Sequence, residues 1–392
     1  MAENIVLVDG VRLAIGTFGG SLTQMPAHEM GGAVVREALQ RAQVPAEDVN
    51  EVIMGCVGQV SGDAFIARRI ALHAGLPVAS TAQTVNRLCG SGLQSIITAA
   101  QWLKSGDADV IVAGGAENMS RLPYYVWNRW GRRLGDGVLE DGVLATVTDP
   151  FGHYAMGMTA EIVAERFHVS REEQDEMAWD SQQRAHQAIQ NGVFDDQILP
   201  ITVKDGRRER IFATDEHVRD TSPEQLAKLR PAFKPGGTVT AGNSSGINDG
   251  AAAVVMMTEG EAERRGLHPR LRLVSYGLAG VNPDIMGYAP VGAIAEALRK
   301  AQMTLDQIDL VELNEAFAAQ SVAVVRDAHL DWGRTNIHGG AIALGHPIGA
   351  TGAILTIKIM HALEERGGRF GLITMCIGGG QGIAAVVERL MR

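Results

Sequence analysis

Cys89 lies in a stretch of small residues that suits nucleophilic chemistry. It opens Cys89-Gly90-Ser91-Gly92, where a loop is expected to become a helix. The unpaired N–H groups and the dipole of a helix N-terminus favour a thiolate, so this placement predicts a nucleophile at neutral pH. Flanking glycines let backbone and substrate approach closely. A lone cysteine is more often a small buried hydrophobe, and this pattern alone leaves both interpretations open.

A histidine occupies the corresponding place further along the chain. His346 stands in Gly345-His346-Pro347, and Ala350 and Gly352 continue a helix start built from small residues. Duplicated α/β domains that pack face to face bring such equivalent helix starts together, so this histidine is expected near Cys89. A hydrogen-bonded loop histidine would look the same, and the motif alone does not choose between the two.

Cys376 and Asn314 stand at the ends of two predicted strands. Cys376 is followed by Ile377-Gly378-Gly379-Gly380, whose backbone N–H groups could donate to an oxyanion or could simply form a tight turn. Asn314 opens Asn314-Glu315-Ala316-Phe317 at the start of a predicted helix, where asparagine is a common cap. Ligands gather at the carboxyl ends of strands in open α/β sheets, so all four motifs are expected at one edge.

An internal repeat predicts the elements that position these residues. Glu37–Gln43 and Glu296–Gln302 are identical at five of seven positions, and each precedes a short apolar strand. The motifs of Cys89 and His346 lie at nearly the same separation, and each leads into an amphipathic helix that ends at glycine. The same order of strands and helices in both halves predicts a duplicated α/β fold with helices on both faces of its sheets.

The pattern also predicts single elements and domain limits. A buried strand is expected from Asp109 to Ala113, followed by Gly114-Gly115, and a helical stretch from Thr159 to Asn191. Residues 120–248 differ in character, being aromatic and basic at first and rich in turns later, which indicates an insertion. The expected domains are a first half at 1–119, completed by about 249–268, the insertion at 120–248, and a second half at 269–392.

Composition excludes several classes of protein. The 392 residues include 47 glycines, well above the average usage of about 7%, but 46% are hydrophobic and only 13 are proline, so a globular protein is expected. A net charge of −10 argues against a nucleic-acid or anionic-membrane binder, and no apolar run approaches the roughly 18 residues of a membrane span. Three scattered cysteines and the lack of CxxC or HExxH spacing predict no disulfide framework, no metal and a reducing, cytoplasmic setting.

Two other motifs compete with the cysteine chemistry. Gly242-Asn243-Ser244-Ser245-Gly246 matches the G-x-S-x-G elbow of serine hydrolases and would make Ser244 the nucleophile. This weaker alternative leaves Cys89 and Cys376 without a role. Gly380-Gln381-Gly382-Ile383-Ala384-Ala385 fits a dinucleotide fingerprint, but only ten residues follow its second glycine. That is too short for a βαβ unit, so we reject it.

Four motifs together resemble one family closely. They are Asn86–Gly92 (NRLCGSG), Asn314–Gln320 (NEAFAAQ), Gly339–Ala350 (GGAIALGHPIGA) and Cys376–Gly380 (CIGGG). In order and spacing they resemble the thiolases, in the branch of acetyl-CoA acetyltransferases and 3-ketoacyl-CoA thiolases. The resemblance implies a five-layered αβαβα fold made of two duplicated halves, with an inserted loop domain. It also implies a homotetramer, formed as a dimer of dimers, that uses coenzyme A as a substrate and has no tightly bound cofactor.

The resemblance assigns catalytic roles by position. It implies that Cys89 is acylated, that His346 activates it, and that Cys376 is the acid/base at the substrate α-carbon. Asn314 would hold a water that forms one oxyanion hole with His346, and the amides of Cys89 and Gly378 would form the other. The implied activity is the reversible, ping-pong cleavage of 3-ketoacyl-CoA to acetyl-CoA and a shortened acyl-CoA, or the reverse Claisen condensation, in fatty acid metabolism. The alternative is a decarboxylating ketoacyl synthase, which shares the fold but needs no base at the place of Cys376.

Contacts with CoA carry over by local motif matching. The residues that the resemblance places against CoA or the acyl chain are Arg219, Ala241, Ser245, Ile247, Ala316, Phe317, Met156 and Met286. Ala155 departs from the pattern, because acetoacetyl-CoA thiolases usually have a histidine there, and the smaller residue predicts longer or substituted acyl chains. The aromatic and basic segment Arg121–Arg133 resembles the family's tetramerisation loop in position, with a free surface loop as the alternative.

Overall fold

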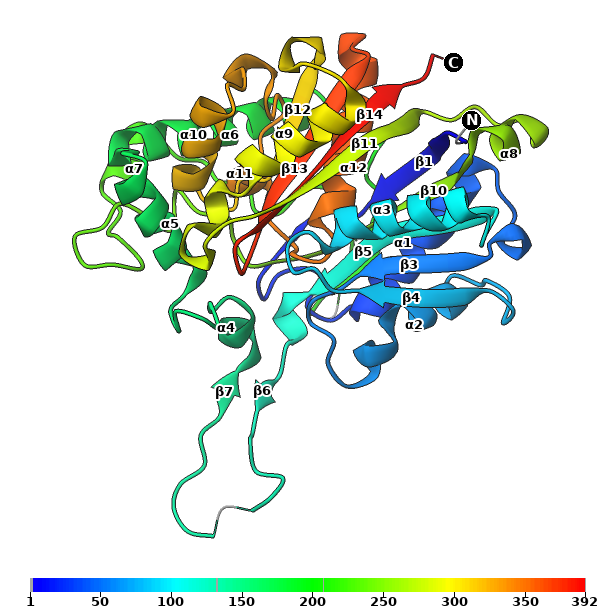
Figure 1. Ribbon diagram of the computed structural model, residues 1–392. Helices are drawn as coiled ribbons and strands as arrows, with labels where there is room; N and C mark the ends of the chain where they lie inside the picture. The colour runs from blue at the N-terminus through cyan, green and yellow to red at the C-terminus, as the bar shows by residue number, and fades with distance from the viewer. Residues whose placement is uncertain (1–2, 132, 207, 392) are drawn as a thin grey trace.

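Two halves of the chain build the same series of elements, as the repeat predicts. The computed structural model describes residues 3–131, 133–206 and 208–391 (Figure 1). The first half comprises β1 (Ile5–Arg12), β2 (Gly16–Thr17), α1 (Ala27–Ala42), β3 (Glu51–Gly55), α2 (Ile66–His73), β4 (Thr81–Val85), α3 (Ser91–Ser105), β5 (Val110–Asn118), β10 (Asn248–Thr258) and α8 (Glu259–Arg264). The second half comprises β11 (Leu271–Gly280), α9 (Pro290–Ala301), β12 (Leu310–Leu313), α10 (Ala318–Asp327), α11 (Ala341–Leu344), α12 (Thr351–Arg366), β13 (Phe370–Ile377) and β14 (Gln381–Arg389).

The strands of both halves follow one pattern. In the first half, β3 runs parallel to β4 and β5, and β10 pairs antiparallel with β5 and β1. In the second half, β12 runs parallel to β13, and β14 pairs antiparallel with β13 and β11. The two half-sheets join along β1 and β11 through three antiparallel residue pairs, from Ile5–Leu273 to Leu7–Leu271. One continuous sheet of ten strands therefore carries both halves.

Helices cover both half-sheets on both faces. Helices α3 and α12 pack against each other, and each also contacts strands, α3 those of the first half and α12 those of both halves. Helices α1 and α2 cover the outer face of the first half, and α9 covers that of the second (Figure 1). The order is outer helices, half-sheet, α3 and α12, half-sheet, outer helices. This is the predicted arrangement of five layers, and it encloses α12 almost completely, with twelve of its sixteen residues buried.

Glycines let the central layers approach to backbone contact. Gly114 and Gly115 were expected to follow the strand that ends at Ala113, but β5 continues through them to Asn118 and is buried throughout. A Cβ on Gly115 would lie 2.1 Å from the carbonyl oxygen of Gly349, which leaves no room for a side chain. The strand is longer than predicted because these glycines serve close packing between layers, which periodicity does not reveal.

The insertion lies between β5 and β10 in the chain and packs against the second half of the molecule. It contains β6 (Tyr124–Tyr125), β7 (Glu140–Asp141), α4 (Gly142–Thr146), α5 (Met156–Arg166), α6 (Arg171–Gln190), β8 (Ile201–Asp205), β9 (Arg208–Phe212) and α7 (Pro223–Ala227). The predicted helical stretch from Thr159 to Asn191 is divided into α5 and α6, because His168 has a φ of +53° and Ser170 caps α6 in a capping box with Glu173. Both helices pack against α10.

A long hairpin projects from the molecule between β6 and β7 (Figure 1). Trp127 and Trp130, between the two strands, are 87% and 93% exposed, and Tyr124 is also exposed, whereas Tyr125 is partly buried. Residue 132 of the predicted aromatic and basic segment lies outside the described residues. Such a group of exposed aromatic side chains is unusual on a monomer surface. Separately, no helix within the described ranges has the length and apolar character to cross a membrane.

Candidate active site

Cys89 is presented by a tight turn just before α3. Leu88 has a φ of +45°, which is an uncommon conformation for a residue with a branched side chain. Its N–H donates to Oδ1 of Asn86 at 3.0 Å, and its carbonyl accepts from the hydroxyl of Ser91 at 2.6 Å. The Ser91 oxygen also accepts from the N–H of Arg87 at 2.9 Å. These bonds hold the turn closed and leave Cys89 partly exposed.

His346 lies in the loop between α11 and α12. The expectation that it begins a helix is wrong in detail, since α12 starts five residues later at Thr351. The backbone N–H of His346 donates to Oδ1 of Asn248 at 2.9 Å, and its Nδ1 lies 2.7 Å from Oγ1 of Thr351. The contact with Thr351 therefore fixes the ring through Nδ1, and Nε2 is the nitrogen on the side of the pocket.

A buried carboxylate ties the loop of His346 to the half that carries Cys89. Glu117, at the end of β5, accepts from the N–H of Val57 at 3.0 Å, of Gly58 at 2.9 Å and of Gly349 at 2.8 Å. The first two donors belong to the first half of the chain, and Gly349 belongs to the second. Burial raises the pKa of Glu117, while these N–H groups partly offset the rise by favouring the carboxylate.

Asn314 and Cys376 lie behind the pocket wall. Phe317, not Asn314, is the N-cap residue of α10, so the interpretation of Asn314 as a cap is wrong. Its Nδ2 lies 3.4 Å from Nε2 of His346, and its buried Oδ1 has no hydrogen-bond partner among the described residues. An unpaired buried acceptor of this kind commonly receives a bond from a water or a ligand. Cys376 is fully buried and packs in one cluster with Met286.

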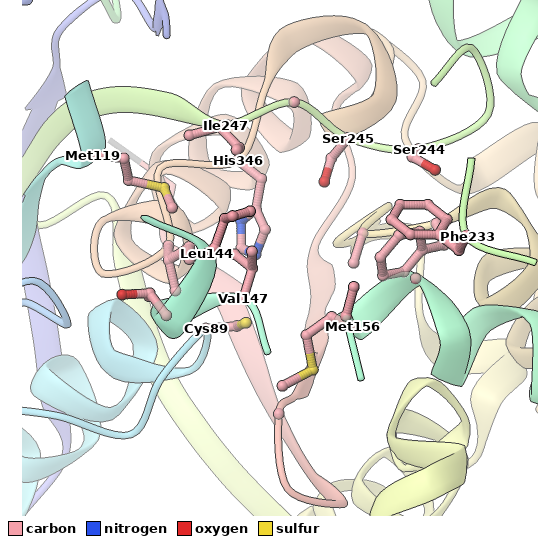
Figure 2. A pocket seen from close by; sticks show the side chains of 18 of the residues that line it. Cys89, Met119, Leu144, Val147, Met156, Phe233, Ser244, Ser245, Ile247 and His346 are labelled. Atoms are coloured by element: carbon pink, nitrogen blue, oxygen red, sulfur yellow. The ribbon is translucent and has the colours of Figure 1, made fainter. Parts of the chain in front are cut away.

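The sequence-predicted residues converge on one pocket of about 390 Å³. Cys89, His346 and Gly378 line it, together with all eight residues expected to contact CoA or the acyl chain, namely Arg219, Ala241, Ser245, Ile247, Ala316, Phe317, Met156 and Met286. Figure 2 shows that Cys89, His346 and Met156 reach this hollow from different elements. The pocket thus joins the insertion with both halves.

Other lining residues were not predicted. They include Leu88, Met119, Leu144, Val147 and Phe233, whereas Ala155, which also lines the pocket, was predicted from its departure from the family pattern. Leu144 comes from the short helix α4 and Phe233 from a loop, and neither belongs to a motif. Their only signal is an apolar residue type in a polar insertion, which does not separate a pocket wall from an ordinary satellite core. Only the packing of the insertion on the halves identifies them.

The electrostatics of Cys89 differ from the expectation for a helix N-terminus. Burial raises the pKa of the Cys89 thiol to about 11, although the backbone N–H groups of Gly378 and of Cys89 itself point at the sulfur and partly offset the rise. The prediction of a resting thiolate was therefore wrong. Gly90 is the N-cap residue of α3, so the sulfur lies ahead of the helix in a largely apolar pocket.

His346 and Cys376 are neutral as well. Burial lowers the pKa of His346 to about 4, and burial together with the nearby Cys89 raises that of Cys376. Burial thus disfavours both the thiolate of Cys89 and the imidazolium ion of His346 in the absence of substrate. The resting pair is thus a thiol and a neutral imidazole. The proton of the Cys89 thiol is transferred to His346 only during the reaction with substrate.

The environment of Ser244 argues against the hydrolase alternative. Its hydroxyl donates to the carbonyl of Thr240 at 2.7 Å. The motif is followed by strand β10 and not by the helix that a nucleophile elbow requires. Ser245 instead binds through its backbone N–H to the carbonyl of Ala316 at 3.0 Å, which brings two predicted CoA contacts together.

Arg219 lines the pocket and is itself an exposed residue. Its backbone N–H donates to Oε1 of Gln182 at 2.9 Å, and its Nη1 donates to the carbonyl of Ala241 at 3.4 Å. Its Nη2 lies 3.4 Å from Nε2 of His217, whose pKa is lowered to about 4 by burial and by Arg219. In the described part of the chain, no group of three or more His, Cys, Asp or Glu side chains could hold a metal.

Comparison with known proteins identifies the family. The family model described as the thiolase N-terminal domain matches residues 5–260, and that of the thiolase C-terminal domain matches residues 267–389. The chain belongs to the thiolase family. Its predicted membership and its two-half thiolase fold are thereby confirmed.

Relatives and solved structures match this thiolase along its whole length. The chain is 53% identical to the beta-ketothiolase BktB of Cupriavidus necator, covering 100% of both chains. The crystal structure of the Bacillus anthracis acetyl-CoA acetyltransferase matches with a TM-score of 0.98, at 46% identity over 99% of each chain. Human mitochondrial 3-ketoacyl-CoA thiolase, in complex with CoA, matches with a TM-score of 0.96, at 44% identity over 99% of this chain and 98% of that one.

The neutral resting pair predicts how Cys89 reacts with an alkylating agent. Iodoacetamide reacts with thiolates, and the pKa of about 11 means that the thiolate fraction rises about tenfold per pH unit below that value. The alkylation rate, followed by peptide mass spectrometry, should therefore climb from pH 7 to pH 10 without levelling off. Cys89→Ala gives the background from the other thiols. A plateau at neutral pH would contradict the neutral pair and indicate a thiolate–imidazolium ion pair.

Proposed function

We propose that this thiolase transfers acyl groups through a thioester on Cys89. It would cleave 3-ketoacyl-CoA with CoA to acetyl-CoA and a shortened acyl-CoA, or run the Claisen condensation in reverse. The observation that carries the proposal is the environment of the Cys89 sulfur, at which the N–H groups of Gly378 and Cys89 point inside a pocket shared with His346. Donors fixed around the carbon that a nucleophile attacks are what acyl transfer requires.

The residues divide the cleavage into steps. The Cys89 sulfur attacks the 3-keto carbon as its proton passes to His346, and the oxygen that becomes negative is stabilised by the N–H groups of Cys89 and Gly378. Collapse of this adduct breaks the bond between C2 and C3. The enolate of acetyl-CoA leaves toward His346 and a water held by Asn314, and Cys376 protonates its α-carbon. The thiol of a second CoA then attacks the thioester as its proton returns to Cys376, and the Cys89 sulfur leaves and regains its proton from His346.

The state of Cys376 suits the protonation step. Burial keeps its pKa raised, so it is a thiol that can donate a proton and not a thiolate. A decarboxylating synthase obtains its carbanion by releasing carbon dioxide and needs no proton donor at this place. The buried thiol beside Met286 therefore favours the non-decarboxylating reaction.

Two variants separate the half-reactions. Cys89→Ala should abolish the acetyl adduct that forms with acetyl-CoA, as measured by intact mass, because it removes the nucleophile. Cys376→Ala should still form the adduct but slow acetoacetyl-CoA cleavage by about 10²–10⁴-fold, the usual contribution of a general acid or base. Cys56→Ala, which removes a buried thiol outside the pocket lining, is the control. Equal losses in both half-reactions of Cys376→Ala, or an adduct on Ser244, would contradict the assigned roles.

The pocket lining supports a broad choice of acyl chain. Ala155 and the flexible side chains of Met156 and Met286 form part of the wall, and methionine adapts to ligands of different shape. The Cε of Met156 lies 3.2 Å from the position of a Cβ on Gly378, so this side chain reaches the donors at the reacting carbon. We propose that the enzyme accepts 3-ketoacyl chains longer than four carbons, including substituted ones.

Filling the position of Ala155 tests this breadth. Ala155→His should lower kcat/KM for 3-ketoacyl-CoAs of six or more carbons by about 10–100-fold relative to acetoacetyl-CoA, because the imidazole occupies space along the chain. Ala155→Ser, which adds little volume, is the control. Thiolysis rates across a series of chain lengths give the answer. Wild-type activity confined to acetoacetyl-CoA would overturn the proposal.

We also propose that the protein is a homotetramer assembled through its hairpin. The support is the exposure of Trp127 and Trp130 on a segment that projects far beyond the body of the molecule (Figure 1). Light scattering should give the mass of four chains, and the double variant W127S/W130S should give that of two because it removes the apolar contact. A wild-type monomer or dimer at micromolar concentration would exclude the tetramer.

A further inference from the structure

Thr351, the first residue of α12, contacts the ring of His346. The side chain is buried, and its Oγ1 lies 2.7 Å from Nδ1 of His346 and 2.9 Å from the carbonyl oxygen of Pro347. The same carbonyl also accepts from the N–H groups of Ala350 and Thr351. The carbonyl of Pro347 is thus the common acceptor of the loop from His346 to Thr351. The hydroxyl that contacts it also contacts the imidazole ring.

The single proton of the Thr351 hydroxyl decides how these contacts are made. A carbonyl oxygen cannot donate, so the contact with Pro347 is a hydrogen bond only if the hydroxyl gives its proton to that oxygen. The hydroxyl then has only lone pairs left for His346, and Nδ1 must be the donor. The opposite arrangement would place two oxygens 2.9 Å apart with no proton between them. Only Nδ1–H satisfies both contacts.

A second contact is compatible with this protonation state. Nδ2 of Asn314 lies 3.4 Å from Nε2 of His346, and an amide nitrogen can only donate. This contact is long and leaves Nε2 available for another proton. The restraint on the tautomer therefore comes from Thr351.

We propose that Thr351 is a positioning residue that holds His346 in the tautomer protonated at Nδ1, so that Nε2 is free to receive the proton of Cys89. The inference rests on the proposed acyl transfer. A neutral imidazole has two tautomers, and the other one would direct an N–H at a thiol and could not accept its proton. The partner of the remote nitrogen therefore determines whether the base can work.

A hydroxyl suits this position better than a carboxylate would. A buried carboxylate beside Nδ1 would stabilise the imidazolium ion, whereas a threonine orients the ring without adding charge. His346 then remains neutral until substrate binds. After it has taken the proton, Nε2–H becomes a donor that can face the enolate oxygen, so the same tautomer serves both steps.

Three variants isolate this contribution. Thr351→Val is nearly isosteric and removes only the hydroxyl. Thr351→Ser restores a hydroxyl on the same backbone position. Thr356→Val is the matched control on the same helix, because the Thr356 hydroxyl is also buried and donates to the carbonyl four residues earlier, Gly352 at 2.8 Å, without touching a histidine.

The kinetic readout is the rate at which Cys89 acquires an acetyl group from acetyl-CoA, by rapid quench and intact mass, from pH 6 to pH 9. Thr351→Val should lower the maximal acylation rate by about 30–100-fold with KM within about threefold, since it disturbs the base and not CoA binding. Its deficit should shrink as pH rises, because hydroxide then removes the thiol proton without His346. Thr351→Ser and Thr356→Val should stay within about threefold of wild type.

Histidine-selective ¹⁵N NMR reads the tautomer directly and does not depend on turnover. His346→Asn identifies the resonance pair, which in wild type should show a protonated Nδ1 and an unprotonated Nε2, and in Thr351→Val should shift toward the other tautomer. A wild-type Nε2–H, a Thr351→Val rate equal to wild type, or equal losses in Thr351→Val and Thr356→Val would overturn the inference. Failure of wild type to form the acetyl adduct would overturn the proposed function, while the NMR result would still decide the tautomer.

Discussion

The active site depends on how one peptide group, that of Gly349, is inserted between the two halves. Its N–H donates to the buried carboxylate of Glu117, and its carbonyl oxygen sits where a Cβ on Gly55 or Gly115 would lie within 2.6 Å. A side chain at either glycine would drive the loop of His346 away from the half that carries Cys89, and shifts of about 1 Å are costly in catalysis. The glycine surplus is thus partly a requirement of this contact between layers.

Close packing also sets the chemistry. The layers that bring Cys89 and His346 together bury His346 and leave Cys89 only partly exposed, and burial then favours the neutral form of each group. The Cys89–His346 pair is consequently neutral before substrate binds. Negative charge forms only during the reaction, on a substrate oxygen to which the fixed N–H groups donate. Such preorganised dipoles stabilise charge most strongly where water is absent.

The sequence was sufficient for the architecture, and it predicted many of the residues that line the pocket. The repeat of helix and strand patterns predicted two similar halves, and four motifs predicted a family that comparison confirmed. Where single positions were judged from local rules, the outcome was mixed. Asn314 looked like a helix cap, but α10 begins later, with Phe317 as its N-cap residue. Cys89 looked like a thiolate because the helix dipole is a local effect, while the burial that raises its pKa comes from segments that are distant in the chain.

By itself, the sequence determined the order of elements and the duplication, because periodicity and short motifs encode these directly. Only the tertiary structure decided the protonation of the site, the walls from Leu144 to Phe233 and the contacts of Glu117 and Thr351. Each of these depends on which side chains meet across layers or on where a single hydroxyl proton goes. The spacing of residues along the chain does not predict these contacts or the placement of that proton, because both depend on distances in the folded structure.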